Sequence, residues 1–325
     1  MHPSGTLASS CGVSHFWIAN TLKPSPLSSF DFQVRFYIVD VFGEKKYTGN
    51  QLAVFRDAQW LGTREMQAIA RETNFSETTF ILSERQEHGG YYVRIFTPNE
   101  ELPFAGHPTL GTAYVIMEEI RRRRVEGVAL NLKVGQIPVT PTYRGSKLDL
   151  LWMRQRPPTF GGELDAAKVA SALGLDGSDV DSRFPVEEVS TGIPFIMLPL
   201  KTRRSVKHCW VNLEKYSGLT KNLESTGILA FAPEPQEKGN DFHTRMFAPG
   251  VGVMEDPATG SAAGCLAAYL VRHRYFGKSE VSARVEQGYE LGRPSLLHLR
   301  AAERRGEIEV HVGGRVFMVA KGEFV

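Results

Sequence analysis

Cysteine is scarce in this sequence, and the scarcity excludes several classes of protein. Only Cys11, Cys209 and Cys265 occur among 325 residues, with no Cys-x-x-Cys pair and no evenly spaced framework. Three scattered cysteines cannot build the disulfide scaffold of a small secreted domain, nor a structural zinc site on their own. An odd, sparse count is typical of a reducing compartment, so we expect a cytoplasmic protein.

A dominant charge and long apolar runs are also missing. The 38 Lys and Arg residues nearly balance the 36 Asp and Glu residues, and the net charge of +2 favours neither nucleic acid nor a membrane surface. No stretch approaches the ~18 uninterrupted apolar residues of a transmembrane helix. The one basic run, residues 121–124, follows an apolar helical stretch and is interpreted as a solvated helix C-terminus.

The length of the chain predicts more than one domain. A chain of 325 residues is long for a single domain, and two domains of roughly 100–150 residues are expected. Residues 1–33 differ from the rest, because they are rich in Ser and Pro and carry Lys23 as their only Lys or Arg. They lack the continuous apolar segment of a secretory signal and the arginines of a mitochondrial address. We interpret them as a poorly ordered extension, or a mis-assigned start, outside the fold.

A duplicated pattern indicates two similar domains. Residues 94–98 (Arg-Ile-Phe-Thr-Pro) reappear as residues 245–249 (Arg-Met-Phe-Ala-Pro), and each copy is followed by Glu-x-Pro-x-x-Gly. The period of about 150 residues is far too long for a solenoid repeat. We therefore predict a first domain at residues 34–150 and a second at residues 151–325, with a last strand that can return to the first.

Each copy lies between a strand-like segment and an apolar helix. Residues 91–96 and 242–247 are predicted strands, and apolar residues then recur at helical spacing within residues 110–117 and 262–269. Both helices are small and apolar enough to lie inside a wrapped sheet. Cys265 lies on the second apolar stripe and is interpreted as a core residue, not a nucleophile. Further predicted strands are 34–42, 148–153 and 307–312, and further predicted helices are 66–71 and 166–173.

The turns that open these two helices are candidate anion sites. The first turn carries Gly106, and the second carries Gly260 followed by Ser261. A helix N-terminus presents unpaired N–H groups and a partial positive charge, and glycine lets a carboxylate approach the backbone closely. In either turn alone the glycine could serve only a tight bend. The repetition favours a small-anion site in a cleft between the two domains.

Ionisable side chains gather near these turns and fit proton transfer. His107 follows Gly106, Asp256 lies before the second turn, and Glu77 follows a short helix among apolar and hydroxyl neighbours. A buried carboxyl has a raised pKa and, like histidine, can exchange protons near neutral pH. An exposed strand-end residue is the alternative for Glu77. We predict that Glu77, His107 and Asp256 transfer a proton at a carbon of a bound anion.

Four segments resemble the phenazine-biosynthesis isomerase family (PhzF-like) and occur in the family's order. They are residues 49–55 (Gly-Asn-Gln-Leu-Ala-Val-Phe), 74–80 (Asn-Phe-Ser-Glu-Thr-Thr-Phe), 102–112 (Leu-Pro-Phe-Ala-Gly-His-Pro-Thr-Leu-Gly-Thr) and 255–264 (Glu-Asp-Pro-Ala-Thr-Gly-Ser-Ala-Ala-Gly). The resemblance implies an α/β (α+β) fold like that of diaminopimelate epimerase. Two similar domains would each wrap a curled, mostly antiparallel sheet around a central helix. It also implies an active site between the domains, a homodimer, and no metal or organic cofactor.

The same resemblance implies a function. The best-understood activity in the family isomerises a dihydro-hydroxyanthranilate by moving a proton from one ring carbon to another. Glu77 matches the residue that carries the proton in the family. His107, Asp256 and Ser261 match side chains that assist it or hold the substrate. Gly106 and Gly260 match positions whose backbone binds the substrate carboxylate. We therefore expect a cofactor-independent isomerase of a small, carboxylated, cyclic metabolite in secondary metabolism.

Other interpretations are weaker, and one stays open. Residues 106–112 lack the Gly-Lys-Ser/Thr ending of a phosphate-binding loop. Ser261 directly follows its glycine, whereas the hydrolase pattern Gly-x-Ser-x-Gly has one residue between them. Superfamily racemases use two cysteines where this sequence has Ala105 and Thr259, and alanine cannot exchange a proton. A non-catalytic member that binds a metabolite or a protein is the alternative function.

Overall fold

A computed structural model describes residues 33–225 and 227–325, and Val34–Phe324 form one compact unit. The extension expected at residues 1–33 lies outside the described residues except for Gln33. The strands are β1 (Val34–Val41), β2 (Asn50–Phe55), β3 (Thr78–Ile81), β4 (Tyr91–Phe96), β5 (Glu101–Leu102), β6 (Val128–Leu132), β7 (Gly135–Arg144), β8 (Lys147–Arg154), β9 (Thr159–Glu163), β10 (Glu187–Ser190), β11 (Pro194–Pro199), β12 (Gly227–Ala232), β13 (Phe242–Ala248), β14 (Val253–Asp256), β15 (Glu280–Gln287), β16 (Ser295–Arg304), β17 (Glu307–Gly314) and β18 (Val316–Phe324). The α-helices are α1 (Thr63–Thr73), α2 (Gly106–Val115), α3 (Ala166–Ala172), α4 (Arg203–His208), α5 (Leu213–Thr220) and α6 (Gly260–Arg272), with a π-helical turn η2 (Ile116–Arg121) and 3₁₀ turns η1 (Ala58–Trp60), η3 (Gly177–Asp179) and η4 (Pro249–Val251). The strands and helices predicted from the sequence are all confirmed, with ends that differ by a few residues.

The strand pairings repeat in two halves of the chain, which we call the first half (β1 to β8) and the second half (β10 to β17). From β1 to β4 the successive pairs are antiparallel, parallel and antiparallel. Strand β4 also pairs antiparallel with β5 and parallel with β6, and β6, β7 and β8 are antiparallel neighbours. The second half repeats this order from β10 to β17. The repeated topology agrees with the duplicated sequence pattern.

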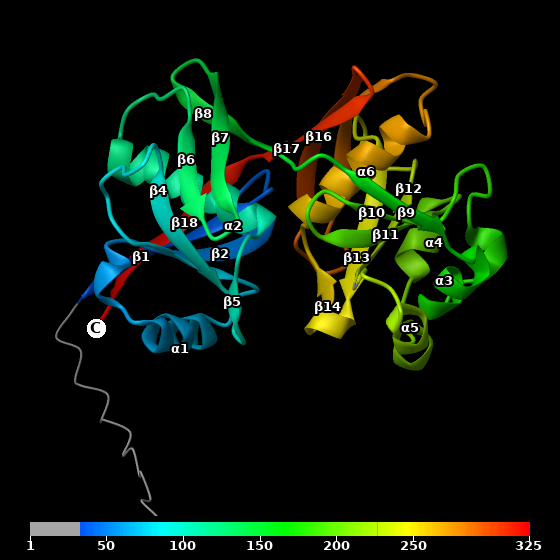
Figure 1. Cartoon of the computed structure of the whole chain (residues 1–325), viewed down its shortest axis with the longest axis horizontal. Coiled ribbons are helices and arrows are strands. Elements are labelled where there is room, and N and C mark those ends of the chain that lie inside the picture. The colour runs from blue at the N-terminus through cyan, green and yellow to red at the C-terminus, as the bar shows by residue number, and fades with distance from the viewer. Residues whose placement is uncertain (1–32, 226) are drawn as a thin grey trace, which may run out of the picture. The chain divides into compact units, whose positions relative to one another are not determined.

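One strand pair joins the halves. Each half also pairs with one further strand, which follows the last strand of the other half along the chain. Strands β8 and β17 pair antiparallel. The chain continues from β8 into β9, which pairs with β10, and from β17 into β18, which pairs with β1 (Figure 1). The last strand therefore returns to the first half. The boundary expected between residues 150 and 151 falls inside β8, and the division into two domains stays a prediction.

Helices α2 and α6 are the buried centres of the two halves (Figure 1). Nine of the ten residues of α2 and twelve of the thirteen residues of α6 are buried. Helix α2 packs against strands of the first half and β18, whereas α6 packs against β10, β11 and β15 to β17. Small residues permit this packing, because a Cβ at Gly111 would lie 2.5 Å from the side chain of Leu52. A helix that is apolar on all sides belongs in a core, as the sequence predicts.

The duplicated motif forms the same ion pair in both halves. Arg94 donates to the carboxylate of Glu101 at 2.8 and 2.7 Å, and Arg245 donates to that of Glu255 at 2.8 and 2.7 Å. Such two-pronged contacts are the strongest form of charge-assisted hydrogen bond. Arg245 also donates to three backbone carbonyls within residues 206–209. The pairs hold β5 and β14 in place just before the turns that open α2 and α6.

Candidate active site

The first turns of α2 and α6 lie against each other. A Cβ at Gly106 would be 3.4 Å from the backbone nitrogen of Ser261 and 3.6 Å from Cα of Gly260. Neither helix has a side-chain cap on its first N–H groups. Uncapped N–H groups carry the positive end of a helix dipole, so the two turns together suit a carboxylate. The three residues predicted to bind substrate are thus brought together.

Glu77 and His107 meet beside these turns. Glu77 directly precedes β3, and His107 is the second residue of α2. Nε2 of His107 lies 3.3 Å from Oε2 of Glu77, and neither atom has a hydrogen-bond partner among the described residues. Only 7% of the His107 side chain and 17% of the Glu77 side chain are exposed. Two facing acid/base atoms without other partners are suited to exchange a proton with a bound molecule.

Burial moves the pKa values of this pair in opposite directions. It raises the pKa of Glu77 to about 8, and the negative charge of Asp256 adds to the rise. Burial lowers the pKa of His107 to about 3, although a hydrogen bond with the backbone of Gln51 opposes the shift. At pH 7 the carboxyl is therefore mostly protonated and the imidazole is neutral. The pair holds one transferable proton.

Asp256, the last residue of β14, contributes the negative charge of the site. Burial raises its pKa to about 6, whereas hydrogen bonds from Thr259 and Asn50 lower it and the charge of Glu255 raises it. Asp256 is thus largely ionised at pH 7, where Glu77 is mostly protonated. Two carboxyls whose environments separate their pKa values are suited to different roles.

Asn50 connects the candidate residues, and it is not predicted from the sequence. Its Nδ2 donates to Oδ1 of Asp256 at 2.9 Å and to the carbonyl oxygen of Ala258 at 3.0 Å. The same nitrogen lies 3.4 Å from Nδ1 of His107. The one available signal was the position of Asn50 in the family-like segment 49–55. The fold was needed to show that one amide reaches an acid 206 positions away.

Thr259 and Gln287 form a second set of buried contacts with Asp256. The Thr259 hydroxyl donates to Oδ2 of Asp256 at 2.5 Å. The Gln287 amide donates to the Thr259 hydroxyl at 3.0 Å and to the Asp256 carbonyl at 2.7 Å, and it accepts from the Thr259 N–H at 3.3 Å. No local sequence pattern indicates Gln287, because it lies at the end of β15.

Arg293 forms hydrogen bonds that link the two halves next to Asn50. Arg293 donates to Oδ1 of Asp40 at 2.6 Å and to the carbonyl oxygen of Gly49 at 2.9 Å. The N–H of Gly49 in turn donates to the carbonyl oxygen of Pro294 at 3.1 Å. These bonds join the turn before β2 to the loop before β16. They hold the Asn50 amide in reach of the second half.

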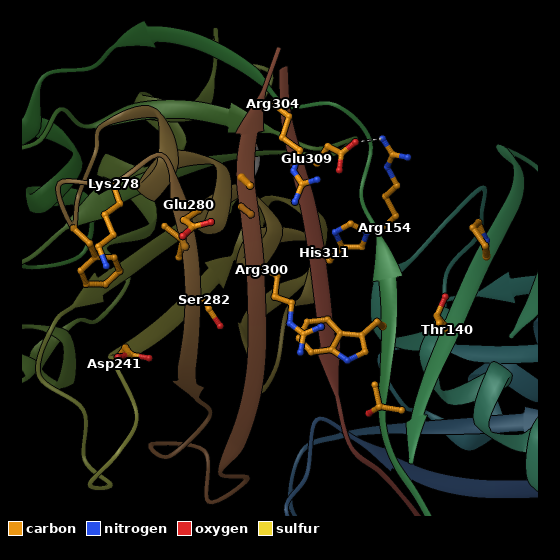
Figure 2. Close-up of a pocket in the computed structure, with 17 residues that line it drawn as sticks. Thr140, Arg154, Asp241, Lys278, Glu280, Ser282, Arg300, Arg304, Glu309 and His311 are labelled. Atoms are coloured by element: carbon orange, nitrogen blue, oxygen red, sulfur yellow. Dashed lines mark hydrogen bonds and ion pairs between the residues drawn. The ribbon is translucent and has the colours of Figure 1, made fainter. Parts of the chain in front are cut away.

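Several other features lie outside the site. A groove of about 1080 Å³ formed by β7, β8 and β15 to β17 is lined by none of the candidate residues (Figure 2). Cys265 is fully buried, which raises its pKa to about 12 and confirms its place in the core. Within residues 33–225 and 227–325, no group of three or more His, Cys, Asp or Glu side chains is arranged to hold a metal ion. No helix in the same ranges is long and apolar enough to cross a membrane.

Known proteins are similar to this chain in sequence and in fold. Residues 39–322 match the family described as phenazine biosynthesis-like protein (PhzC-PhzF). A trans-2,3-dihydro-3-hydroxyanthranilate isomerase of Pseudomonas aeruginosa is 36% identical over 291 residues, which cover 87% of this chain and 97% of that protein. An uncharacterized isomerase of Clostridium acetobutylicum is 32% identical over 295 residues, 89% of this chain and 97% of its own. The crystal structure of a phenazine biosynthesis protein of the PhzF family from Bacillus anthracis matches with a TM-score of 0.83 at 26% identity, covering 90% of this chain and 99% of that chain. The predicted fold class is thereby confirmed.

Proposed function

The chain belongs to the phenazine biosynthesis-like (PhzC-PhzF) family and is an isomerase, and we propose that Glu77 moves a proton between carbons of a small, carboxylated, cyclic metabolite. The observation that carries this proposal is the facing pair of Glu77 and His107, 3.3 Å apart and without other hydrogen-bond partners in the described chain. A buried carboxyl whose pKa is raised to about 8 can both take up and release a proton near neutral pH.

The helix N-termini supply the binding step. The substrate carboxylate would accept hydrogen bonds from the uncapped N–H groups that begin α2 and α6, at Gly106 and at Gly260 and Ser261. Both turns are buried, so these hydrogen bonds would form in a region of low dielectric, where they are stronger than in water. A carboxylate held in this way would place the carbon skeleton of the substrate beside Glu77.

Proton transfer then needs no external reagent. Ionised Glu77 removes a proton from one carbon, so that a C–H bond breaks and an O–H bond forms. The same carboxyl returns the proton to a different carbon, which completes the isomerisation without any redox change. Neutral His107 contacts Oε2 of Glu77 and keeps this carboxyl in position during both steps. The negative charge of Asp256 disfavours ionised Glu77 and makes it a stronger base.

The relatives suggest a substrate class and a setting. Because the Pseudomonas aeruginosa relative is named for trans-2,3-dihydro-3-hydroxyanthranilate, cyclic carboxylates of this kind are the first candidates. We also propose that the protein works without a metal or organic cofactor, as a homodimer, in secondary-metabolite biosynthesis. Sedimentation of the purified chain tests the dimer directly.

Proton NMR in heavy water tests the reaction. Purified protein is incubated with dihydro-hydroxyanthranilate and related cyclic carboxylates, with Glu77→Gln as the control. Deuterium that enters at a ring carbon only with intact Glu77 supports the proposal, since the amide has a similar volume but cannot exchange the proton. Normal turnover by Glu77→Gln would contradict the mechanism. Tight binding without exchange in any candidate would instead favour a non-catalytic, metabolite-binding role.

A further inference from the structure

The groove of Figure 2 carries a row of basic side chains that the proposed reaction does not use. Arg300 of β16 pairs directly with His311 of β17, and His311 pairs directly with Arg154 of β8. Ser282 of β15 lies opposite Arg300 on the other side and completes the row. All four line the groove from adjacent strands (Figure 2). The two arginines place positive charge along this row, which favours a bound anion.

Arg300 is the member of this row without an acidic partner. Its guanidinium lies over the Trp152 ring, with Cζ 4.0 Å from the ring centroid, and makes no ion pair within the described ranges. Arg154, by contrast, pairs with Glu309 at 3.3 Å. The planar fork of Arg300 is therefore free to bind the oxygens of a ligand in two-pronged fashion.

Two neighbours of Arg300 bear on its guanidinium. Trp152, which is 7% exposed, lines the groove and lies with its ring under that guanidinium. Stacking on an aromatic face holds the plane of the guanidinium in place for a ligand. Burial lowers the pKa of His311, and the nearby charges of Arg154 and Arg300 add to this effect against the opposing charge of Glu309. His311 is therefore a neutral member of the row, and the positive charge of the row comes from Arg154 and Arg300.

We propose that this groove is a binding site for a phosphate monoester group, held by Arg300 with Arg154 and Ser282. A dianion offsets two cationic side chains, and its oxygens match the guanidinium fork. The acidic Asp241, Glu280 and Glu309 and the basic Lys278 and Arg304 also line the groove, so its four Arg and Lys side chains exceed its three acids by one charge. The site is separate from the residues proposed for proton transfer.

Calorimetric titration of the full chain with phenyl phosphate and with inorganic phosphate tests this site. Arg300→Gln should weaken binding of phenyl phosphate by about tenfold or more, which is the usual effect of losing a charged hydrogen bond. Arg35→Gln removes an equally positive, exposed side chain from β1 and should change the affinity by less than about twofold. Thermal unfolding of both variants checks that the fold is kept.

Three outcomes would overturn the phosphate site. Equal weakening in Arg300→Gln and Arg35→Gln would show attraction by net charge alone. Saturable binding of inorganic phosphate without binding of phenyl phosphate would exclude an ester. Loss of a dimer in Arg300→Gln, with no saturable phosphate binding to either form, would show that a second copy of the chain covers this face.

A second observation, independent of the groove, concerns Thr259. The residue occupies the N-cap position of α6, but its hydroxyl does not cap the helix. The hydroxyl instead donates to Asp256, as described above, and accepts from Gln287. The Gln287 Nε2 is a donor only, so the Thr259 hydroxyl must accept from it. The single hydroxyl hydrogen of Thr259 is then left to donate to the Asp256 carboxylate.

On the basis of the proposed function, we further propose that Thr259 and Gln287 are positioning residues that fix the Asp256 carboxylate and keep it ionised. Hydrogen bonds to the charged form of an acid favour that form. Burial and the like charge of Glu255 act in the opposite direction, whereas Asn50 donates from the first half. His107 is neutral and adds no charge of its own. The charge that raises the pKa of Glu77 would therefore depend on Thr259.

A ¹³C NMR titration of Asp-labelled protein tests this role without any turnover. Thr259→Val should raise the pKa of Asp256 by about 1, and Thr259→Ser should restore it, because serine keeps the hydroxyl. Gln287→Met should produce a smaller rise. Asp256→Asn identifies the signal. Thr112→Val removes another buried hydroxyl, which bonds Thr79 instead of an acid, so it should leave the Asp256 signal unchanged.

The result separates the two proposals. An unchanged pKa of Asp256 in Thr259→Val would sink the positioning role whatever the enzyme's activity. A raised pKa together with full turnover by Glu77→Gln would retain the hydrogen-bond chain and reject only the proposed reaction.

Discussion

At the position where the first half of the chain carries Glu77, the second half carries Gly227. The correspondence follows from strand register. The phenylalanine of each copy of the duplicated motif, at residues 96 and 247, pairs with a residue of the neighbouring strand, and Glu77 and Gly227 each come directly before that residue. In the second half there is no room for a side chain there, since a Cβ at Gly227 would lie 2.7 Å from the ring of Phe195. Likewise His107 corresponds to Ser261, because each follows the glycine that opens its central helix.

The comparison separates what the fold requires from what the chemistry requires. Both halves keep the strand order, the buried helix and the Arg–Glu ion pair, because these features close a core around an apolar helix. The acid/base pair occurs only in the first half, and Asp256 with its hydrogen-bond partners Thr259 and Gln287 occurs only in the second. The site is therefore a joint product of two halves that share a fold but contribute different groups.

The largest effect is expected from removing the proton carrier that only the first half has. Glu77→Gln should lower kcat by about 10³-fold while the protein still folds and binds its substrate, because the amide cannot exchange a proton. Steady-state kinetics and a binding titration measure the two quantities. Glu72→Gln, which alters an exposed glutamate on α1, is the matched control and should be near wild type. Loss of substrate binding in Glu77→Gln would indicate a binding role instead.

The next comparison sets His107 against its counterpart Ser261. His107→Asn should lower kcat by about 10²-fold, because His107 contacts the reacting carboxyl. Ser261→Ala should raise KM more than it lowers kcat, because Ser261 belongs to the proposed carboxylate site. Equal effects of the two variants on both parameters would remove the functional difference between the halves.

The Arg–Glu pairs test whether the halves differ in stability. Arg245→Gln should destabilise the fold by about 3 kcal/mol, since it leaves Glu255 buried without its partner. Arg94→Gln should cost only about 1 kcal/mol, because Arg94 is more exposed, at 24% against 10%, and Glu101 keeps Lys133 as a partner. Urea unfolding measures both free energies. A larger loss for Arg94→Gln would reverse this assignment.

The smallest expected effect is a displacement of the pH profile. The pKa of Glu77 is raised to about 8, so its ionised form accumulates as pH rises, and kcat/KM should increase through that range. Asp256→Asn removes the neighbouring negative charge, so the increase should move to lower pH even though the maximal rate falls. Profiles of the two proteins between pH 5 and 10 give the comparison. A midpoint that stays in place would mean that Asp256 does not act on Glu77.

Local patterns in the sequence were enough for the outline of the fold. The apolar stripes that include Leu110 and Cys265 identified both central helices, and the duplicated motif indicated two related halves. The sequence led us to expect that a last strand can return to the first half, but nothing near residue 150 marks the pair of β8 with β17 or the pair of β9 with β10. Long-range pairing depends on which edges meet once both sheets have formed.

Glu77, His107, Asp256 and the two helix turns could be identified from local sequence. The folded chain was needed to show that Glu77 and His107 face each other, that Asn50 reaches Asp256, and that Gln287 donates to its carbonyl. Local sequence cannot show this, because a pKa depends on burial and on neighbouring charges, which come from segments far apart in the chain. A glutamate becomes a proton carrier near neutral pH only where the fold removes it from water.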